Sequence, residues 1–287
     1  MEVKTHPSVL YLSDKRSLYL GQLGDTLSQC HAAGALLLAL EGTLSLTDSV
    51  TCQEYQSRSF LIPVGCRIQI HAQGTPIAVA FLEPLGRDMI CLSKKMSQKV
   101  MSDGKVVFYR GILDEDEVIA TAQKLVQDNA GAKQALAALS DWIGPKNDLN
   151  FEPDSRVVEA IRLIKATYTE NLPVEDIARK VELSTPRLIQ LFKQVTGIPI
   201  RRYRMWYRIY MTAVKAAAGM PLTEASIAAG FSDYSQFSRT FKEIGGVSPS
   251  DVLSARDNVS IRVHHAQSIL SPRASDQRLP AHSCDCA

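Results

Sequence analysis

The stretch Phe231-Ser-Asp-Tyr-Ser-Gln-Phe-Ser-Arg-Thr-Phe-Lys-Glu-Ile-Gly-Gly246 decides the fold of the second half of this 287-residue chain, because it occurs twice in related form. The earlier copy is Leu183-Ser-Thr-Pro-Arg-Leu-Ile-Gln-Leu-Phe-Lys-Gln-Val-Thr-Gly197. Each copy has an apolar residue, then a serine, then an apolar residue four positions before the Phe of Phe-Lys. This is a helical spacing, so the chain contains an internal repeat whose unit is a short amphipathic helix.

A serine precedes each repeated helix, and a shorter helical stretch precedes the serine. Ser184 and Ser232 are predicted as N-caps, because a serine hydroxyl accepts hydrogen bonds from the free amides of the first helical turn. The preceding stretches, residues 174–181 and 222–229, share Ile-Ala. A helix, a tight turn and a capped helix form a helix-turn-helix, whose second helix fits the major groove of B-DNA. The sequence predicts two such units, at about residues 174–196 and 222–245.

A single unit of this kind would also fit an ordinary helical hairpin in an all-α domain. Two copies favour DNA binding, because both second helices carry long polar side chains where packing does not require them. Residues 151–256 hold fifteen Lys and Arg against eleven Asp and Glu, and residues 199–218 hold five basic side chains and no acid. A basic stretch of this kind attracts the phosphate backbone of a nucleic acid, although an ordinary solvent-exposed helix face has the same composition.

Residues from about 155 to 256 resemble the DNA-binding domain of the AraC/XylS family of transcription regulators. The specific match is Gly230-Phe-Ser-Asp-Tyr-Ser-Gln-Phe-Ser-Arg-Thr-Phe-Lys242, closed by Gly246-Val-Ser-Pro249. The resemblance implies double-stranded DNA as the partner. It also implies seven helices, with the long basic helix at residues 199–218 holding two recognition helices about one DNA turn apart in adjacent major grooves.

The first unit departs from the family pattern at Glu182, where the family commonly has glycine before Leu-Ser. A turn at this position often needs a positive φ, which costs a residue other than glycine about 1 kcal/mol. Pro186 is tolerated near the helix start, because the first amides of a helix have no helical partner. We therefore expect strain in the turn, an intact fold, and a first helix that reads fewer bases directly.

The candidate DNA-contacting residues lie on the two second helices. Arg239 is the candidate for a bidentate contact to guanine, and Gln190 and Gln236 are candidates for adenine. Lys193 and Lys242 are expected to contact phosphates. Each of these also fits an ordinary surface side chain. The full set is Thr185, Pro186, Arg187, Gln190, Lys193, Asp233, Tyr234, Ser235, Gln236, Arg239 and Lys242.

The first hundred residues offer short apolar runs bounded by Gly, Pro, Asp and Ser, with strict alternation near residues 43–47 and 67–71. Such runs predict short strands of a small antiparallel sandwich or β-barrel, of which we expect the barrel, with helices after it. The chain is therefore predicted as a two-domain α+β protein with an all-α C-terminal domain. In many members of the family the barrel is cupin-like and the following helices make the dimer contact.

Four segments follow from this division. We expect a cupin-like sensing domain at 1–110, a helical dimerisation region and linker at 111–150, the AraC-type DNA-binding domain at 151–256, and a disordered tail at 257–287. The tail is polar and contains proline, which argues against a packed core there.

The sequence does not offer the ligands of a cupin enzyme, which needs paired histidines, a carboxylate and a further histidine. The corresponding places read Gln29-Cys30-His31-Ala32 and Gly65-Cys66-Arg67. No catalytic residue, metal site or cofactor is predicted; His31 and His71 fit structural roles or a pocket wall. The cysteine side chains have two possible roles, as redox sensors or as small buried apolar groups. They are Cys30, Cys52, Cys66 and Cys91, with an isolated Cys284 and Cys286 pair near the end.

Three classes of function remain open. The first is a regulator whose N-terminal domain responds to a small molecule or a partner and forms a homodimer; RNA polymerase is a further candidate partner. The second is a ligand-independent regulator whose N-terminal domain only dimerises. The third is an enzyme carrying a DNA-binding module, for which the sequence offers no nucleophile constellation. No apolar run reaches membrane-spanning length and no export signal is evident, so we expect a cytoplasmic protein without membrane contact.

Overall fold

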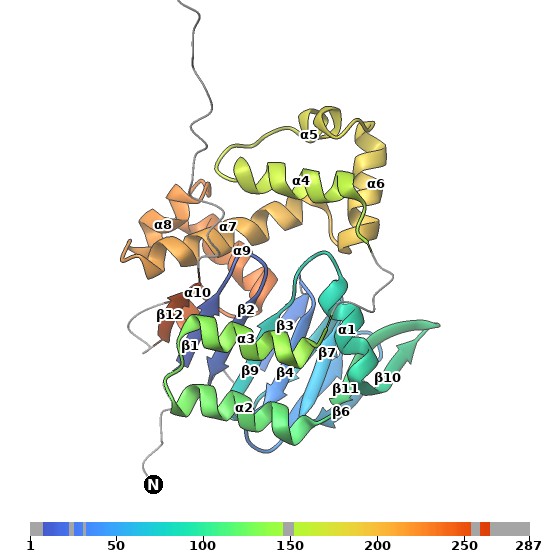
Figure 1. Cartoon of the computed structure of the whole chain (residues 1–287), viewed down its shortest axis with the longest axis vertical. Coiled ribbons are helices and arrows are strands. Elements are labelled where there is room, and N and C mark those ends of the chain that lie inside the picture. Colours follow the sequence, from blue (N-terminus) through green and yellow to red (C-terminus); the bar gives the residue numbers. More distant parts are fainter. Residues whose placement is uncertain (1–7, 23–25, 31–32, 146–151, 254–258, 265–287) are drawn as a thin grey trace, which may run out of the picture.

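The computed structural model describes residues 8–22, 26–30, 33–145, 152–253 and 259–264. Strands dominate the first half of the chain and helices the second, and the two halves pack against each other (Figure 1). The two-domain α+β prediction is confirmed. No helix within these residues is long and apolar enough to cross a membrane.

The N-terminal domain contains two β-sheets. The larger sheet has the strand order β10-β11-β7-β4-β9-β2-β1-β12, and the smaller has the order β3-β8-β5-β6. All neighbouring strands are antiparallel except β1 and β12, which are parallel. The strands are β1 (Ser8–Leu12), β2 (Ser17–Gly21), β3 (Thr26–Cys30), β4 (Ala35–Ala39), β5 (Leu44–Asp48), β6 (Glu54–Ser57), β7 (Ser59–Ile62), β8 (Arg67–His71), β9 (Ile77–Phe81), β10 (Met96–Ser102), β11 (Lys105–Ile112) and β12 (Val259–Val263).

The predicted β-barrel is not confirmed, because the larger sheet is open. Its ends are β10 and β12, and these two strands do not pair with each other in the described part of the chain. At one end, β10 and β11 form a long hairpin that projects from the body of the domain (Figure 1). At the other end, a strand from the C-terminal side of the chain occupies the edge of β1.

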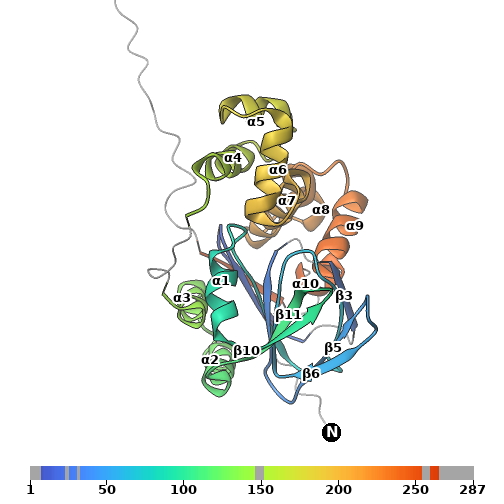
Figure 2. The ribbon, with the colours of Figure 1, turned by 90° about the vertical axis from the view of Figure 1, so that its right-hand side faces the viewer.

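Three helices cover one face of the larger sheet, and the smaller sheet lies on its other side (Figure 2). They are α1 (Arg87–Lys95), α2 (Glu115–Gln127) and α3 (Ala132–Ile143). Along β4, Leu36 and Leu38 join the core beneath these helices, whereas Ala35 and Leu37 join the core that includes the smaller sheet. Because neighbouring side chains of a strand point to opposite faces, an entirely apolar strand such as β4 is buried on both sides.

The C-terminal domain consists, within residues 152–253, of seven helices, the number that the family resemblance implies. They are α4 (Ser155–Ala166), α5 (Val174–Lys180), α6 (Thr185–Thr196), α7 (Ile200–Ala217), α8 (Leu222–Ala228), α9 (Tyr234–Gly245) and α10 (Pro249–Leu253). The long helix α7 runs between α4–α6 and α8–α10 (Figures 1 and 2). A core that includes Ile164, Ile177, Leu188 and Phe192 joins α4, α5 and α6 to the start of α7.

The expected disordered tail contains a strand, which corrects that prediction for residues 259–263. Strand β12 pairs with β1 over its whole length, from Ser8 opposite Val259 to Leu12 opposite Val263. The backbone N–H of His264 also donates to the carbonyl of Leu12, at 2.8 Å. The segment Val-Ser-Ile-Arg-Val has the apolar-polar alternation of a strand, but the polar residues around it favoured a prediction of disorder. Cys284 and Cys286 lie outside the described residues.

The side chain of Arg262 connects β12 to the turn between α2 and α3. Its guanidinium donates to the backbone carbonyls of Asn129 and Ala130, and lies 5.9 Å from the centre of the Tyr11 ring. The chain therefore returns from the C-terminal domain to the edge of the N-terminal sheet and is held there by both backbone and side-chain contacts.

Candidate nucleic-acid interface

Helix α6 presents a polar face to solvent. Ser184 occupies its N-cap position in an extended conformation, but its hydroxyl makes no cap hydrogen bond, and Pro186 lies in the first turn. Arg187, Gln190 and Lys193 are exposed. The guanidinium of Arg187 donates to the side-chain oxygen of Gln190 at 3.0 Å, so these two side chains form one polar unit. Leu188, Leu191 and Phe192 are buried on the opposite face.

Helix α9 is capped by Asp233 and not, as predicted, by Ser232. The Asp233 carboxylate accepts a hydrogen bond from the backbone N–H of Gln236 at 2.7 Å, and the Gln236 side-chain oxygen accepts one from the backbone N–H of Ser232 at 2.9 Å. This reciprocal pair satisfies two amides at the helix start. The backbone hydrogen bond from Gln236 is the main reason that the pKa of Asp233 is lowered.

The exposed face of α9 carries Ser235, Arg239 and Lys242. Tyr234 is half-buried and its ring lies 5.8 Å from that of Phe237, so it packs against its own domain. Gln236 is partly buried and its oxygen is used in the cap. Of the predicted residues on this helix, Arg239 and Lys242 therefore project most freely, whereas Tyr234 and Gln236 also support the domain.

Arg204 and Arg208 of the basic run on α7 have structural roles. Arg208 is buried; its Nε donates to the carbonyl of Tyr168 at 2.7 Å and its Nη2 to the side-chain oxygen of Asn171 at 3.0 Å. Arg204 donates to the carbonyl of Leu172 at 2.7 Å. Burial lowers the pKa of both guanidinium groups. These arginines bind the loop between α4 and α5.

The first turn of α7 differs from the rest of the run. Arg201 is exposed, and the Nη2 of Arg202 lies 3.7 Å from the Oε1 of Glu243 on α9. Between this turn and α9 lies a groove of about 560 Å³, whose lining includes Arg201, Arg202, Gln236, Arg239, Thr240 and Glu243. The exposed basic surface is thus confined to the end of α7 nearest α6.

A second, apolar cavity of about 100 Å³ lies where the two domains meet. Strands β1, β2 and β9 and helices α7, α9 and α10 line it, with side chains that include Leu10, Tyr19, Phe81, Trp206, Tyr210 and Phe241. Burial raises the pKa of Tyr210 to about 12, so its phenol is neutral at physiological pH. Such a cavity suits an apolar ligand better than a polar one.

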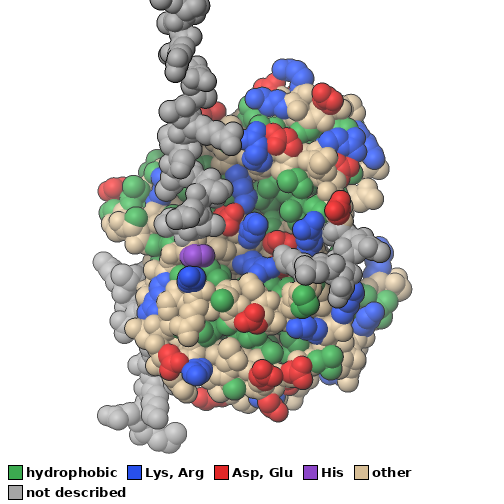
Figure 3. Space-filling view, in the orientation of Figure 1, with side chains coloured by type: hydrophobic (Ala, Val, Ile, Leu, Met, Phe, Trp, Pro, Cys, Tyr) green, Lys and Arg blue, Asp and Glu red, His purple; other side chains and the backbone are tan. Residues whose placement is uncertain are grey.

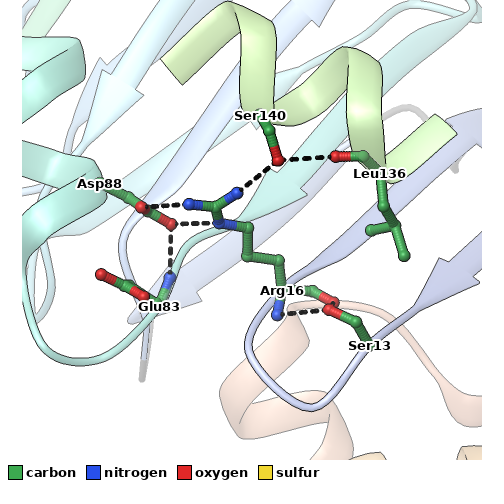
Figure 4. Close-up of polar contacts among 6 residues, drawn as sticks. All are labelled: Ser13, Arg16, Glu83, Asp88, Leu136 and Ser140. Carbon is green, nitrogen blue, oxygen red and sulfur yellow. Dashed lines mark hydrogen bonds and ion pairs between the residues drawn. The ribbon is translucent and has the colours of Figure 1, made fainter. Parts of the chain in front are cut away.

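The one cation in the described wall of this cavity, Arg16, is already paired (Figure 4). Its Nε and Nη2 each lie 2.6 Å from a carboxylate oxygen of the fully buried Asp88, and its Nη1 donates to the Ser140 hydroxyl at 2.9 Å. Asp88 also accepts the backbone N–H of Glu83 at 3.2 Å. Arg16 thus joins β1–β2, α1 and α3 of the N-terminal domain.

A polar contact crosses the domain boundary beside the cavity. The Lys165 ammonium on α4 donates to the Asp14 carbonyl at 2.9 Å and lies 5.4 Å from the centre of the Tyr207 ring. Burial lowers the pKa of Lys165. On the face shown in Figure 3, the surface is hollowed along this boundary, where basic and acidic side chains gather. The contact ties the turn between β1 and β2 to the C-terminal domain.

The other chemically active side chains of the N-terminal domain are scattered. Within the described residues, no three His, Cys, Asp or Glu side chains lie together in a group that could hold a metal ion. His71 lies 3.5 Å from the Thr47 hydroxyl. Cys66 donates to the carbonyl of Val107, Cys91 is buried and Cys52 is exposed. His31 lies outside the described residues.

Residues 177–255, which span α6 to α10, match a family model described as a helix-turn-helix domain. Over 100 residues the chain is 35% identical to the arabinose operon regulatory protein of Escherichia coli, covering 34% of each protein. The C-terminal domain of the chain is a helix-turn-helix domain of the AraC type. A second relative, the Msm operon regulatory protein of Streptococcus mutans, is 31% identical over 102 residues, 35% of this chain and 37% of that protein. The chain thus spans about a third of the length of these relatives.

A likeness of fold to solved structures extends over both domains of the chain. The structure of apo ToxT from Vibrio cholerae matches 84% of this chain and 97% of that chain with a TM-score of 0.56. At 15% identity this is a likeness of fold alone. The sequence motif did not indicate Glu243 as a site residue, whereas Arg201 belongs to the basic stretch at residues 199–218. Glu243 lies four residues after Arg239, one helical turn along the same face, and that spacing is the signal that would have found it.

Proposed function

We propose that the chain is a sequence-specific DNA-binding transcription regulator that reads two half-sites in successive major grooves through α6 and α9. The observation that carries the proposal is the repeated construction of the helix pairs α5–α6 and α8–α9 on the central helix α7. In both pairs the second helix buries its apolar face and exposes Lys and Arg: Arg187 and Lys193 on α6, Arg239 and Lys242 on α9. Two helix-turn-helix units of this kind present base-contacting side chains to two grooves.

The exposed residues suggest different roles. Arg239 is exposed and is the candidate for a bidentate contact to guanine, and the paired Arg187 and Gln190 are the best-placed readers on α6. Lys193 and Lys242 lie one turn further along each helix, where phosphate contacts are expected. Thr185, Pro186, Asp233 and Ser235 lie in the first turns and approach the DNA with the helix starts. The identities of the relatives as operon regulators support this assignment.

We also propose that the N-terminal domain controls DNA binding, with α2 and α3 forming a homodimer contact. A structure of ToxT, which shares this fold, holds an unsaturated fatty acid. This supports control by a small molecule, and the apolar cavity between the domains is the place that this chain offers. A ligand-independent regulator is the alternative; it predicts that no compound bound by the full chain changes its affinity for DNA.

The proposal is tested by in-vitro selection of genomic fragments with the full-length protein at two salt concentrations. A motif of two boxes about one helical turn apart should be enriched. Arg239→Ala should weaken the selected site by about 1 to 3 kcal/mol and relax specificity, whereas Lys193→Ala should weaken selected and random DNA alike. Enrichment of no motif at either salt concentration would contradict the proposal, because phosphate attraction alone is blind to sequence.

A further inference from the structure

The groove between the first turn of α7 and α9 has an unusual balance of charge. Among the described residues that line it, three are arginines and one is a carboxylate, Glu243. Arg201 and Arg239 are exposed, and the side chain of Arg202 is 26% exposed. The groove is therefore a cationic surface with a single acid placed on it.

The position of the groove places it between the two helices proposed to read DNA. Its α7 wall begins at Pro199, two residues after Gly197 ends α6. Its α9 wall is the helix face that carries Gln236, Arg239 and Glu243. A duplex that contacts α6 in one major groove and α9 in the next must pass its intervening backbone across this space.

Glu243 does little for the stability of the fold. Its carboxylate lies 3.7 Å from the Arg202 guanidinium and its side chain is 73% exposed, a geometry in which ion pairs contribute little. Its stronger effect is on the charge that the groove presents, because it neutralises Arg202 and would repel a phosphate.

We propose that this groove binds the backbone phosphates between the two half-sites, and that Glu243 suppresses sequence-blind binding by occupying Arg202 in the free protein. Arg201 is the phosphate contact available at once, and Arg202 becomes available when a phosphate replaces the Glu243 carboxylate. Glu243 thereby makes tight binding depend on the base contacts of α9. This inference rests on the proposed function, since it assumes that α6 and α9 contact one duplex.

The test compares Glu243→Gln with Glu41→Gln, which removes the same charge from an exposed position between β4 and β5 of the N-terminal domain. Binding of the full-length protein to a duplex with the selected site and to a scrambled duplex is measured by fluorescence anisotropy over a series of salt concentrations. Glu243→Gln should tighten binding to the scrambled duplex about fivefold, the effect of removing one unit charge about 4 Å from a phosphate in water. The slope of log affinity against log salt should steepen by about 0.9, one additional phosphate contact.

Two further variants make the inference specific. Adding Arg202→Ala to Glu243→Gln should abolish the gain, because Arg202 is the group released. Arg201→Ala alone should weaken both duplexes alike and flatten the salt slope by about 0.9. If Glu243→Gln and Glu41→Gln behave alike on both duplexes, the groove has no such role. If the wild-type protein does not distinguish the two duplexes, the proposed function itself fails.

Discussion

Glu182 and Gly230 occupy the same turn position of the two helix pairs and share a left-handed backbone, with φ of 56° and 94°. Gly230 is required by space as well as by conformation: a Cβ there would lie 3.0 Å from the Nε and 3.1 Å from the Cζ of Arg208. Glu182 is exposed, so only its conformation is unfavourable. The strain expected from the sequence at Glu182 is therefore present, and the repeat holds despite it.

Replacing Glu182 by glycine should stabilise the C-terminal domain. The left-handed conformation costs a residue with a Cβ roughly 1 to 2 kcal/mol, and glycine gives back about 0.5 to 1 kcal/mol in backbone entropy. We expect Glu182→Gly to raise the free energy of unfolding by about 0.5 to 1 kcal/mol in urea denaturation. Glu182→Ala removes the charge but keeps the Cβ and should gain nothing; an equal gain in both variants would point to electrostatics instead.

Arg208 should be important for folding and not for the salt dependence of DNA binding. Arg208→Ala removes the two hydrogen bonds that the buried guanidinium donates to the Tyr168 carbonyl and the Asn171 side chain, and hydrogen bonds to charged groups contribute about 1.5 to 3 kcal/mol each. We expect a loss of about 3 kcal/mol or more in thermal or chemical unfolding. Arg201→Ala, on the same helix but exposed, should change stability by less than about 0.5 kcal/mol. Similar stability losses in the two variants would contradict the structural role of Arg208.

The cap of α9 should make its stability depend on pH. Because the pKa of Asp233 is lowered from 3.8 in the folded protein, its contribution is fully present above that value and disappears as the pH falls through the lowered pKa. Asp233→Ala should therefore lower the melting temperature at pH 7, and its difference from the wild type should shrink as the pH falls through the lowered pKa. Asp233→Asn keeps an acceptor but does not titrate, so it should lose less at pH 7. A deficit of Asp233→Ala that is independent of pH would exclude the carboxylate as its source.

The helical half of the molecule was predictable because its signals are local. The spacing from Leu188 to Phe192 and from Phe237 to Phe241 identified the buried faces of α6 and α9 directly. The cap was misassigned because Ser232 and Asp233 are adjacent and both are good N-caps; only the backbone geometry selects Asp233.

The remaining errors concern contacts between distant parts of the chain. From the sequence alone, Arg208 looks like a surface charge. Its contact with the loop at Asn171 forms only in the folded chain, and no local sequence pattern indicates this contact. Whether the sheet closes depends on which strands meet at its edges, and β12 comes from the other end of the chain. Arg202 and Glu243 are far apart in sequence and become neighbours only through the packing of α7 on α9.

The attachment of β12 to β1 gives a final prediction, which concerns how the two domains are joined. The backbone N–H of His264 donates to Leu12, and amides that face one side of a strand recur at every second residue. The amides of Arg262 and Ser260 therefore also face β1. Ser260→Pro removes one of these donors and fixes φ near −65°, a value unsuited to the strand.

Because Ser260 is exposed, Ser260→Ala is a matched control that leaves the ladder intact. We expect hydrogen exchange at Arg262 and His264 to accelerate in Ser260→Pro and to stay unchanged in Ser260→Ala. The melting temperature of Ser260→Pro should also fall, since losing the strand exposes Val259 and withdraws Arg262 from Asn129. Unchanged exchange in the proline variant would mean that side-chain packing holds this segment without the ladder to β1. The expected result would show that backbone pairing at the sheet edge helps to join the DNA-binding domain to the N-terminal domain.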